Sequence, residues 1–419
     1  MVTRLRSILP KIKEAWLILG VTLLLLISLE AALSLFYVIK DHIEASPRFP
    51  SRDVRIKADA YGGAPWVNAY YKEFEEASIN RWVPYVYWRR APYQGEHIHI
   101  DAGGIRRTWT DGTARAKTHD PLVVFTFGGS AMWGTGARDD FTIPSFLAKQ
   151  LKEKGVDSQI TNFAEIGYVS TQEVILLLRQ LQKGNIPDVA IFYDGANDTY
   201  SAYQQQTAGL PQNEFNRAKE FNLSLPTRSR PLRALCIRRW TGELSTVRFV
   251  RNVLRRLGVS VGQTGTAIHQ AAQGDSLASR EALSRQVLTL YARNMDLVKV
   301  LGQSYGFKTL FYWQPTIFDK KHLTEYEESQ RRSIEGLQPL CEGVRGCMRL
   351  GEIVAEHADA FCDLGETFAG VSEPVFIDWC HVSEWGNEVI ARRIAADALR
   401  GLGSSSAAGR QAQKGWQQG

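Results

Sequence analysis

Hydrophobic and polar positions alternate in a regular rhythm from about residue 121 to residue 400. Short apolar runs rich in β-branched and aromatic residues predict buried strands, and longer stretches with apolar residues at helical spacing predict amphipathic helices. We expect strands at 122–127, 159–163, 189–193, 308–313 and 360–363, and helices at 143–154, 171–183, 280–305 and 384–400. Strands that alternate with helices indicate a parallel sheet with both faces covered, which is a three-layer α/β/α sandwich.

The N-terminal pattern is different. Trp16 to Ile39 is an apolar run of 24 positions interrupted by one acid, Glu30, and roughly 20 such residues cross a bilayer as a helix. Basic residues precede the run, so the positive-inside rule predicts a cytoplasmic N-terminus and an extracytoplasmic remainder, on the periplasmic or extracellular side. A signal peptide cleaved near Ala32-Leu33-Ser34 is the alternative to a single-pass anchor. The role of Glu30 stays open.

These patterns divide the chain into segments. We expect a cytoplasmic N-terminus (1–14), a transmembrane anchor (15–39), a juxtamembrane aromatic and basic segment (40–115), the α/β domain (116–401) with an inserted, partly helical basic subdomain (about 204–279), and a disordered tail (402–419). Arginines beside aromatic rings in 40–115 could line a sugar site or form a packed collar. The insert could rest on the membrane, cap the site or be a solvated basic face.

Charge and cysteines narrow the function classes. The formal net charge is +6, but residues 217–256 alone hold eleven Lys or Arg against two acids, a balance of +9, so the remainder is slightly acidic. No zinc-finger spacing or RNA-binding aromatic signature accompanies this charge, and we expect no nucleic-acid partner. Five cysteines are too few for a disulfide scaffold; Cys341 and Cys347 could close a small loop or be small buried side chains. No metal and no organic cofactor is indicated.

Polar residues that could carry chemistry follow the predicted strands. Ser130 comes after Phe-Gly-Gly at the end of the first strand, and Asp378 and His381 precede the last helix. His381 could take the proton from Ser130 while Asp378 orients the imidazole ring. The N–H groups of Ser130 and Gly167, with the side-chain amide of Asn197, would supply three donors to a developing oxyanion. Each motif alone is weak evidence, and the conjunction predicts a nucleophilic serine site.

Taken together, these motifs resemble the SGNH hydrolase family, also called GDSL lipases and esterases, over residues 120 to 400. The resemblance rests on Phe-Gly-Gly-Ser at 127–130, Asn162 through Gly167, Gly-Ala-Asn-Asp at 195–198 and Asp-Trp-Cys-His at 378–381. It implies a flavodoxin-like sheet, a Ser130–His381–Asp378 triad and an oxyanion hole of Ser130, Gly167 and Asn197. Gly129 departs from the pattern, because many relatives have Asp there. The Gly-x-Ser-x-Gly elbow of α/β-hydrolases is absent around Ser130.

The expected function is a serine esterase that forms an acyl-enzyme and acts on an O-acyl ester, first of all an O-acetyl ester of an envelope polysaccharide. Transfer of the acyl group to a sugar hydroxyl and hydrolysis of a lipid ester, as in a lysophospholipase, are alternatives within the same chemistry. A non-catalytic polysaccharide-binding or assembly protein is the alternative from a different class. The acyl group, its acceptor and the oligomeric state are not indicated by the sequence.

Overall fold

The structure of the chain is a computed structural model. It describes residues 2–44, 51, 53–112, 121–223, 244–256, 277–349, 351 and 359–400. Its contacts divide the chain into two compact units, one formed by residues 1–50 with 215–267 and the other by residues 51–214 with 268–419. The expected tail at 402–419 and Cys236 lie outside the described residues.

The larger unit is built on a five-stranded parallel sheet. Its strands are β5 (Leu122–Gly128), β6 (Ser158–Asn162), β7 (Val189–Asp194), β8 (Lys308–Trp313) and β9 (Phe361–Asp363). They lie in the order β6-β5-β7-β8-β9, with every neighbouring pair parallel. This is the flavodoxin-like order, in which ligand sites form where the order reverses beside the first strand. The predicted fold class is therefore confirmed.

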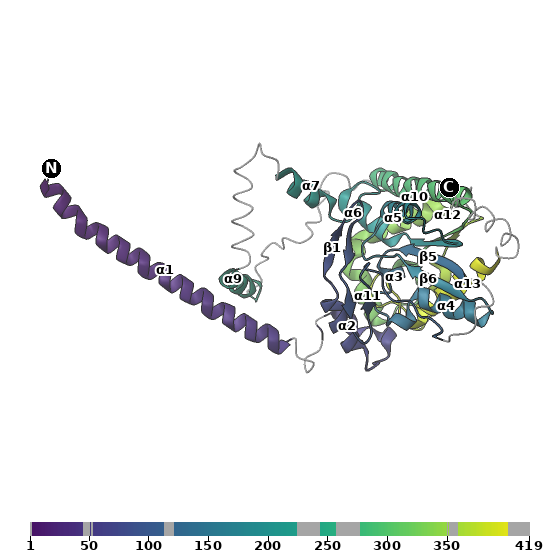
Figure 1. Ribbon diagram of the computed structural model, residues 1–419, viewed down its shortest axis with the longest axis horizontal. Helices are drawn as coiled ribbons and strands as arrows, with labels where there is room; N and C mark the ends of the chain where they lie inside the picture. Colours follow the sequence, from purple (N-terminus) through teal and green to yellow (C-terminus); the bar gives the residue numbers. More distant parts are fainter. Residues whose placement is uncertain are drawn as a thin grey trace. The chain divides into compact units, whose positions relative to one another are not determined.

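Helices cover both faces of the sheet (Figure 1). One layer contains α4 (Ile143–Glu153) and α13 (Glu384–Arg400), and the other contains α5 (Ser170–Gln182), α10 (Leu277–Tyr305) and α12 (Gln338–Arg349). Among the described residues beyond residue 120, the other α-helices are α3 (Ser130–Trp133), α6 (Ala196–Gln205), α7 (Glu214–Leu223), α9 (Ser245–Arg256) and α11 (Glu325–Ser333). Every helix and strand expected after residue 120 is present, with ends within three residues of the prediction.

Alternate side chains of the strands enter two separate cores. Ile191 and Tyr312 face the layer of α4 and α13, whereas Phe127, Phe192 and Phe311 face the layer of α5, α10 and α12. These three phenylalanines are register partners on adjacent strands, and their rings stack at centroid distances of 4.7 and 5.3 Å. Such aromatic stacking adds to the apolar area that each ring buries and fixes the strands that carry the site.

Residues 53–112 pack on the sheet as part of the same unit. Their elements are α2 (Val67–Glu76), β1 (Asn80–Val83), β2 (Tyr87–Arg90), β3 (Tyr93–Gln94) and β4 (His99–Ile100). Arg89 and Arg90 are buried and donate to backbone carbonyls, Arg89 to Phe163 and Arg90 to Ala77. These two guanidinium groups therefore hydrogen-bond backbone inside the unit, which favours the packed-collar alternative over a sugar site for Arg89 and Arg90.

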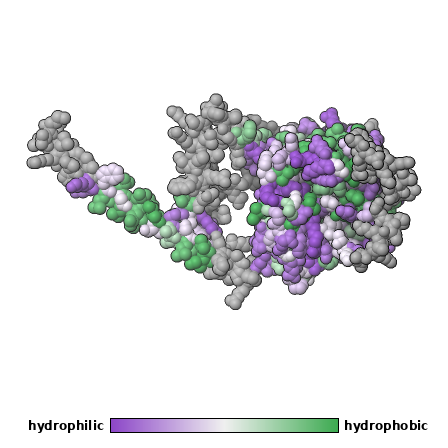
Figure 2. Space-filling view, in the orientation of Figure 1, coloured by the Kyte–Doolittle hydropathy of each residue, from purple (hydrophilic) through white to green (hydrophobic). Residues whose placement is uncertain are grey.

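The smaller unit contains the N-terminal helix α1 (Val2–Glu44). Its stretch Trp16–Lys40 is long and apolar enough to cross a membrane, and its most apolar part is not buried. The side of this stretch visible in Figure 2 is predominantly hydrophobic. Helix α9 packs against α1 within this unit.

In the larger unit, Cys341 and Cys347 are buried free thiols, so the small disulfide loop considered for them is not formed.

Candidate active site

Ser130 lies where the central strand β5 ends. The chain leaves the strand through Gly128 (φ 154°), where a Cβ would overlap the carbonyl oxygen of Tyr193. Gly129 follows in an ordinary negative-φ conformation, and Ser130 opens the short helix α3. The two glycines therefore produce a sharp turn that sets the serine at the carboxyl end of the sheet, where parallel α/β folds form their sites.

The loop before α13 brings His381 and Asp378 to the same place. His381 Nε2 lies 2.6 Å from Ser130 Oγ, although 251 residues separate them in sequence. On the other side of the ring, His381 Nδ1 lies 2.6 Å from Asp378 Oδ2. Asp378 also accepts the backbone N–H groups of Cys380 and His381, so the aspartate shapes the turn that presents the imidazole. The structure thus joins the three predicted residues in one hydrogen-bonded chain.

A residue that sequence reasoning missed stands behind the aspartate. Arg55 Nη1 lies 3.4 Å from Asp378 Oδ2, and the same guanidinium is bound by Asp53. Burial alone would raise the pKa of the Asp378 carboxyl, but the attraction of His381, its hydrogen bonds and Arg55 together hold that pKa well below its ordinary value. Asp378 therefore stays ionised, which is the state that stabilises a protonated imidazole.

Asn197 approaches the serine from the end of β7. A Cβ at Gly129 would overlap the amide nitrogen of Asn197, so the side-chain NH₂ of Asn197 lies directly beside the residue before Ser130. Gln212 Nε2 donates to Asn197 Oδ1 at 3.2 Å, which turns the NH₂ end toward the serine. Gln212 was not among the predicted residues. With Asn197 in this position, glycine at 129 is the residue that avoids the overlap.

Gly167 lies in the loop after β6 with φ of 81°, a left-handed conformation that favours glycine. A Cβ there would approach the Oε1 atom of Gln212 at 3.2 Å, so Gln212 is next to both Gly167 and Asn197. The collar holds this loop, because Trp88 Nε1 donates to the carbonyl of Ile166 at 2.9 Å. The predicted oxyanion donors Ser130, Gly167 and Asn197 therefore come from three loops at one edge of the sheet.

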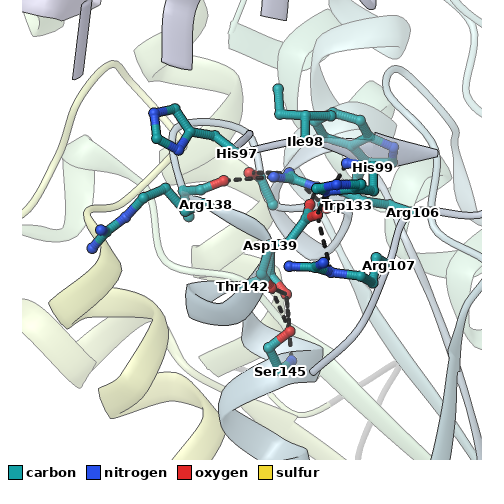
Figure 3. Close-up of polar contacts among 12 residues, drawn as sticks. His97, Ile98, His99, Arg106, Arg107, Trp133, Arg138, Asp139, Thr142 and Ser145 are labelled. Carbon is teal, nitrogen blue, oxygen red and sulfur yellow. Dashed lines mark hydrogen bonds and ion pairs between the residues drawn. The ribbon is translucent and has the colours of Figure 1, made fainter. Parts of the chain in front are cut away.

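A buried ion pair supports the loop that follows Ser130 (Figure 3). Arg106 Nε donates to Asp139 Oδ1 at 2.9 Å, and the same guanidinium donates to the carbonyls of Gly134 and Ala137, each at 2.6 Å. It also lies over the ring of Trp133, 4.3 Å from its centroid. Because removing one partner of a buried pair leaves the other charge uncompensated, this network fixes the α3 turn strongly. From the sequence, Arg106 was one of the arginines that could line a sugar site or form a packed collar, and its contacts with the loop after Ser130 were not predicted.

Asp378, Cys380 and His381 also present ligand atoms within 4.8 Å of one another, as a metal site would. The chemistry of the donors does not fit a cation. Burial raises the pKa of the Cys380 thiol well above its ordinary value, whereas a metal binds the thiolate. Both ring nitrogens of His381 already face Asp378 and Ser130. These residues are therefore arranged for proton transfer rather than for metal binding.

No protein-family model matches the chain, and no curated relative matches it. Among solved structures, the chain is similar to an acetyl xylan esterase, AlAXEase, with 13% identity and a TM-score of 0.32 over 67% of this chain and 100% of the other. It is similar to a Clostridium thermocellum family 3 carbohydrate esterase, with 13% identity and a TM-score of 0.33 over 68% and 99%. A lipolytic protein of the G-D-S-L family from Veillonella parvula gives 11% identity and a TM-score of 0.34 over 67% and 98%. At these values the likeness carries no argument about activity.

Proposed function

We propose that the chain is a serine esterase of the SGNH type, with Ser130 as nucleophile, His381 as general base and acid, and Asp378 as the orienting carboxylate. The observation that carries the proposal is the pair of contacts made by His381, 2.6 Å to Ser130 Oγ and 2.6 Å to Asp378 Oδ2. A nucleophile within hydrogen-bond reach of a base that a third group orients is the geometric signature of this chemistry.

The reaction follows from the positions of these atoms. Ser130 Oγ attacks the ester carbonyl while its proton passes to His381 Nε2, and the oxyanion accepts hydrogen bonds from the N–H groups of Ser130 and Gly167 and from the Asn197 amide. Collapse of the tetrahedral intermediate breaks the ester C–O bond, and His381 returns the proton to the leaving alcohol. An acyl-enzyme remains on Ser130, and water activated by His381 releases the acid.

The proposed substrate is an O-acyl ester, in the first place an O-acetyl group on an envelope polysaccharide. One observation supports this choice: the candidate membrane span at Trp16–Lys40 would tether the site near the cell envelope. Transfer of the acyl group to a sugar hydroxyl uses the same acyl-enzyme. The two outcomes are separated by adding a carbohydrate acceptor and measuring whether acetyl appears on the sugar or only as free acetate.

The test compares the purified full-length chain with Ser130→Ala on a chromogenic acetyl ester. Ser333→Ala is the matched control, because its hydroxyl bonds only the carbonyl of Gln330 within an exposed helix end. We expect full activity in the control and background activity in Ser130→Ala. A fluorophosphonate should also label the peptide that contains Ser130. Equal turnover by all three proteins would overturn the enzyme proposal and leave a binding or assembly role for the fold.

We also propose that α1 is an uncleaved anchor whose N-terminus lies in the cytoplasm. The supporting features are the length of the apolar stretch and the basic residues before it, which follow the positive-inside rule. Two experiments test the anchor and its orientation. The full-length chain should float with membrane vesicles, and the α/β domain should be protected from protease in inverted vesicles but not in right-side-out vesicles. Release of a soluble, shortened chain would instead indicate signal-peptide cleavage.

A further inference from the structure

An acid in the middle of an apolar helix needs an explanation, because a carboxylate in hydrocarbon is costly unless it is paired or hydrogen-bonded. Glu30 is the acid within the candidate span Trp16–Lys40. Its two carboxylate oxygens accept from the first turn of α9: Ser245 N at 2.5 Å, Thr246 N at 3.0 Å and Thr246 Oγ1 at 2.8 Å. The first N–H groups of a helix lack partners within it and carry partial positive charge. Glu30 therefore serves as the N-terminal cap of another helix.

The contact continues along one face of each helix. Ser34 and Tyr37 follow Glu30 at four and seven residues, which is one stripe of α1. The hydroxyl of Ser34 lies 2.9 Å from that of Ser245. Further along α9, Asn252 donates to the Tyr37 hydroxyl at 3.2 Å, and the Arg248 guanidinium lies 4.1 Å from the centre of the Tyr37 ring. Ser245, Arg248 and Asn252, which form one edge of the polar side of α9, thus face α1.

The apolar side of α9 is left exposed. Phe249, Val250 and Val253 are 45%, 53% and 37% exposed, although they lie on a helix of twelve residues. The sequence of this helix also contains four arginines and no acid. An amphipathic helix with a basic polar side and an apolar side of this kind is typical of a helix that lies in the membrane interface. Its partner must offer both an apolar layer and negative charge.

The depth in the bilayer at which α9 contacts α1 agrees with a position of α9 at the membrane interface. About 20 helical residues cross a hydrocarbon layer of ~30 Å. If the crossing begins at Trp16, it ends at Leu35, which marks the far boundary of the layer. Glu30 is five residues before that point, and at ~1.5 Å per residue it lies ~7 Å inside the boundary. Interfacial helices sit about 5–10 Å into this boundary. A helix held at Glu30 to Tyr37 is therefore at the depth that an interfacial helix occupies.

We propose that α9 is an interfacial helix of the leaflet opposite the N-terminus: Glu30 docks it on the anchor, its apolar side enters the acyl chains, and its basic side binds anionic phospholipid headgroups. This inference rests on the proposed membrane anchor and not on the esterase chemistry. It gives the basic insert a lipid ligand, and it makes Glu30 a docking residue. A second copy of the chain, covering the apolar side, would be the competing occupant.

The test attaches a nitroxide spin label to Val250→Cys in the full-length chain in nanodiscs. The control carries the label on Lys183→Cys, at an exposed position of the α/β domain. The unsubstituted chain measures background labelling. We expect the label at 250 to collide with oxygen rather than with a water-soluble nickel chelate, at about 5–10 Å below the phosphates, and the label at 183 to show the reverse. The protection at 250 from the nickel chelate should be stronger with phosphatidylglycerol than with phosphatidylcholine alone.

Equal nickel collision at both labels would overturn the inference, and equal protection in both lipids would overturn the proposed binding of anionic headgroups. Spin–spin broadening that disappears on dilution with unlabelled chain would assign the face to a second copy.

Glu30→Gln tests the docking residue, with Leu29→Ala, an exposed neighbour on the same helix, as the matched control. We expect nickel collision at residue 250 to rise several-fold in Glu30→Gln and to stay unchanged in Leu29→Ala. Both variants should still float with vesicles and hydrolyse a water-soluble acetyl ester at the normal rate. Loss of flotation would instead refute the anchor, and absence of esterase activity in every variant would refute the proposed function alone. Unchanged nickel collision of the label at residue 250 in Glu30→Gln would refute the docking role of Glu30.

Discussion

A methyl group at position 129 should disable the site without disturbing the fold. Gly129 has φ of −82° and ψ of −153°, which is extended backbone that alanine adopts without strain. Its added Cβ would overlap the amide nitrogen of Asn197 and would touch little else, the next neighbour being the carbonyl of Tyr168 at 3.6 Å. The Asn197 side chain can rotate away, but the NH₂ group then leaves the place where the oxyanion would form.

The magnitude follows from what the displaced group is proposed to do. Loss of one oxyanion donor typically costs about 10²–10³ in kcat, which is ~2.7–4 kcal/mol of transition-state stabilisation. Gly129→Ala should therefore lower kcat by about the same factor as Asn197→Ala. The melting temperature should change little, because the overlap is relieved by one side chain at the site and leaves the two cores intact.

The assay is steady-state hydrolysis of a chromogenic acetyl ester by Gly129→Ala, Asn197→Ala and the double variant. If both changes act through the same hydrogen bond, the double variant should be no slower than either single variant, since groups that act as a unit are not additive. Gly346→Ala is the control, because a Cβ there meets no atom within 4 Å. Wild-type turnover in Gly129→Ala, or losses that multiply in the double variant, would refute the role given to Asn197.

Three further outcomes follow from the same site. Asp378→Asn should lower kcat by about 10⁴ with little change in KM, because the amide favours the wrong imidazole tautomer; a loss below tenfold in the same ester assay would contradict the triad. Arg55→Met should lower kcat by roughly tenfold, or ~1.4 kcal/mol, since the buried guanidinium holds Asp378; unchanged kcat would give Arg55 a purely structural role. Burial raises the pKa of Asp194 from 3.8 to about 8, and burial also raises the pKa of its buried neighbour Glu173 well above its ordinary value. The folded chain then binds more protons than the unfolded chain between these values, so stability should fall as pH rises through that window, and Glu173→Gln should flatten the decline in melting temperature between pH 5 and 8.

The sheet and its main helices could be predicted because their pattern is local. The strand Val189–Asp194 is buried on both faces, and its first five residues are therefore continuously apolar. Helix α12 could not be predicted in the same way, because it contains Pro339, Gly343 and Gly346, which have low helix propensity. Packing of its apolar side against α10 overrides that propensity.

The candidate site could be located because each of its residues follows a strand or precedes the last helix. The sequence alone could not identify the residues that hold them. Gln212 is one polar residue in a connection, and only its bond to Asn197 gives it a role. The role of Glu30 in α1 could not be predicted either, because its partners Ser245 and Thr246 lie more than 200 residues away in the sequence. Long-range hydrogen bonds of this kind leave no periodic signal.

One pattern among the contacts that the sequence did not predict concerns the collar, which is formed by residues 53–112. Three of its arginines each hold one loop of the candidate site: Arg55 contacts Asp378, Arg89 donates to the carbonyl of Phe163 in the loop that leads to Gly167, and Arg106 donates to Gly134 and Ala137 after Ser130. The collar is therefore a part of the structural unit that forms the candidate site, and the α/β pattern that begins near residue 121 does not mark the start of that unit.

This arrangement makes a prediction about truncation. A chain that begins at residue 116 keeps every strand of the sheet and every proposed catalytic residue, but it loses all three guanidinium groups and leaves the buried carbonyls that they satisfy without donors. Each such group costs ~1–3 kcal/mol, so several together exceed much of the stability of an ordinary domain. We expect the 116–419 chain to be insoluble or inactive, and the 51–419 chain to fold and to hydrolyse the acetyl ester at the rate of the full-length protein. Full activity of the shorter chain would show that the α/β layers alone position Ser130, His381 and Asp378, and that the three arginines only fasten the collar to them.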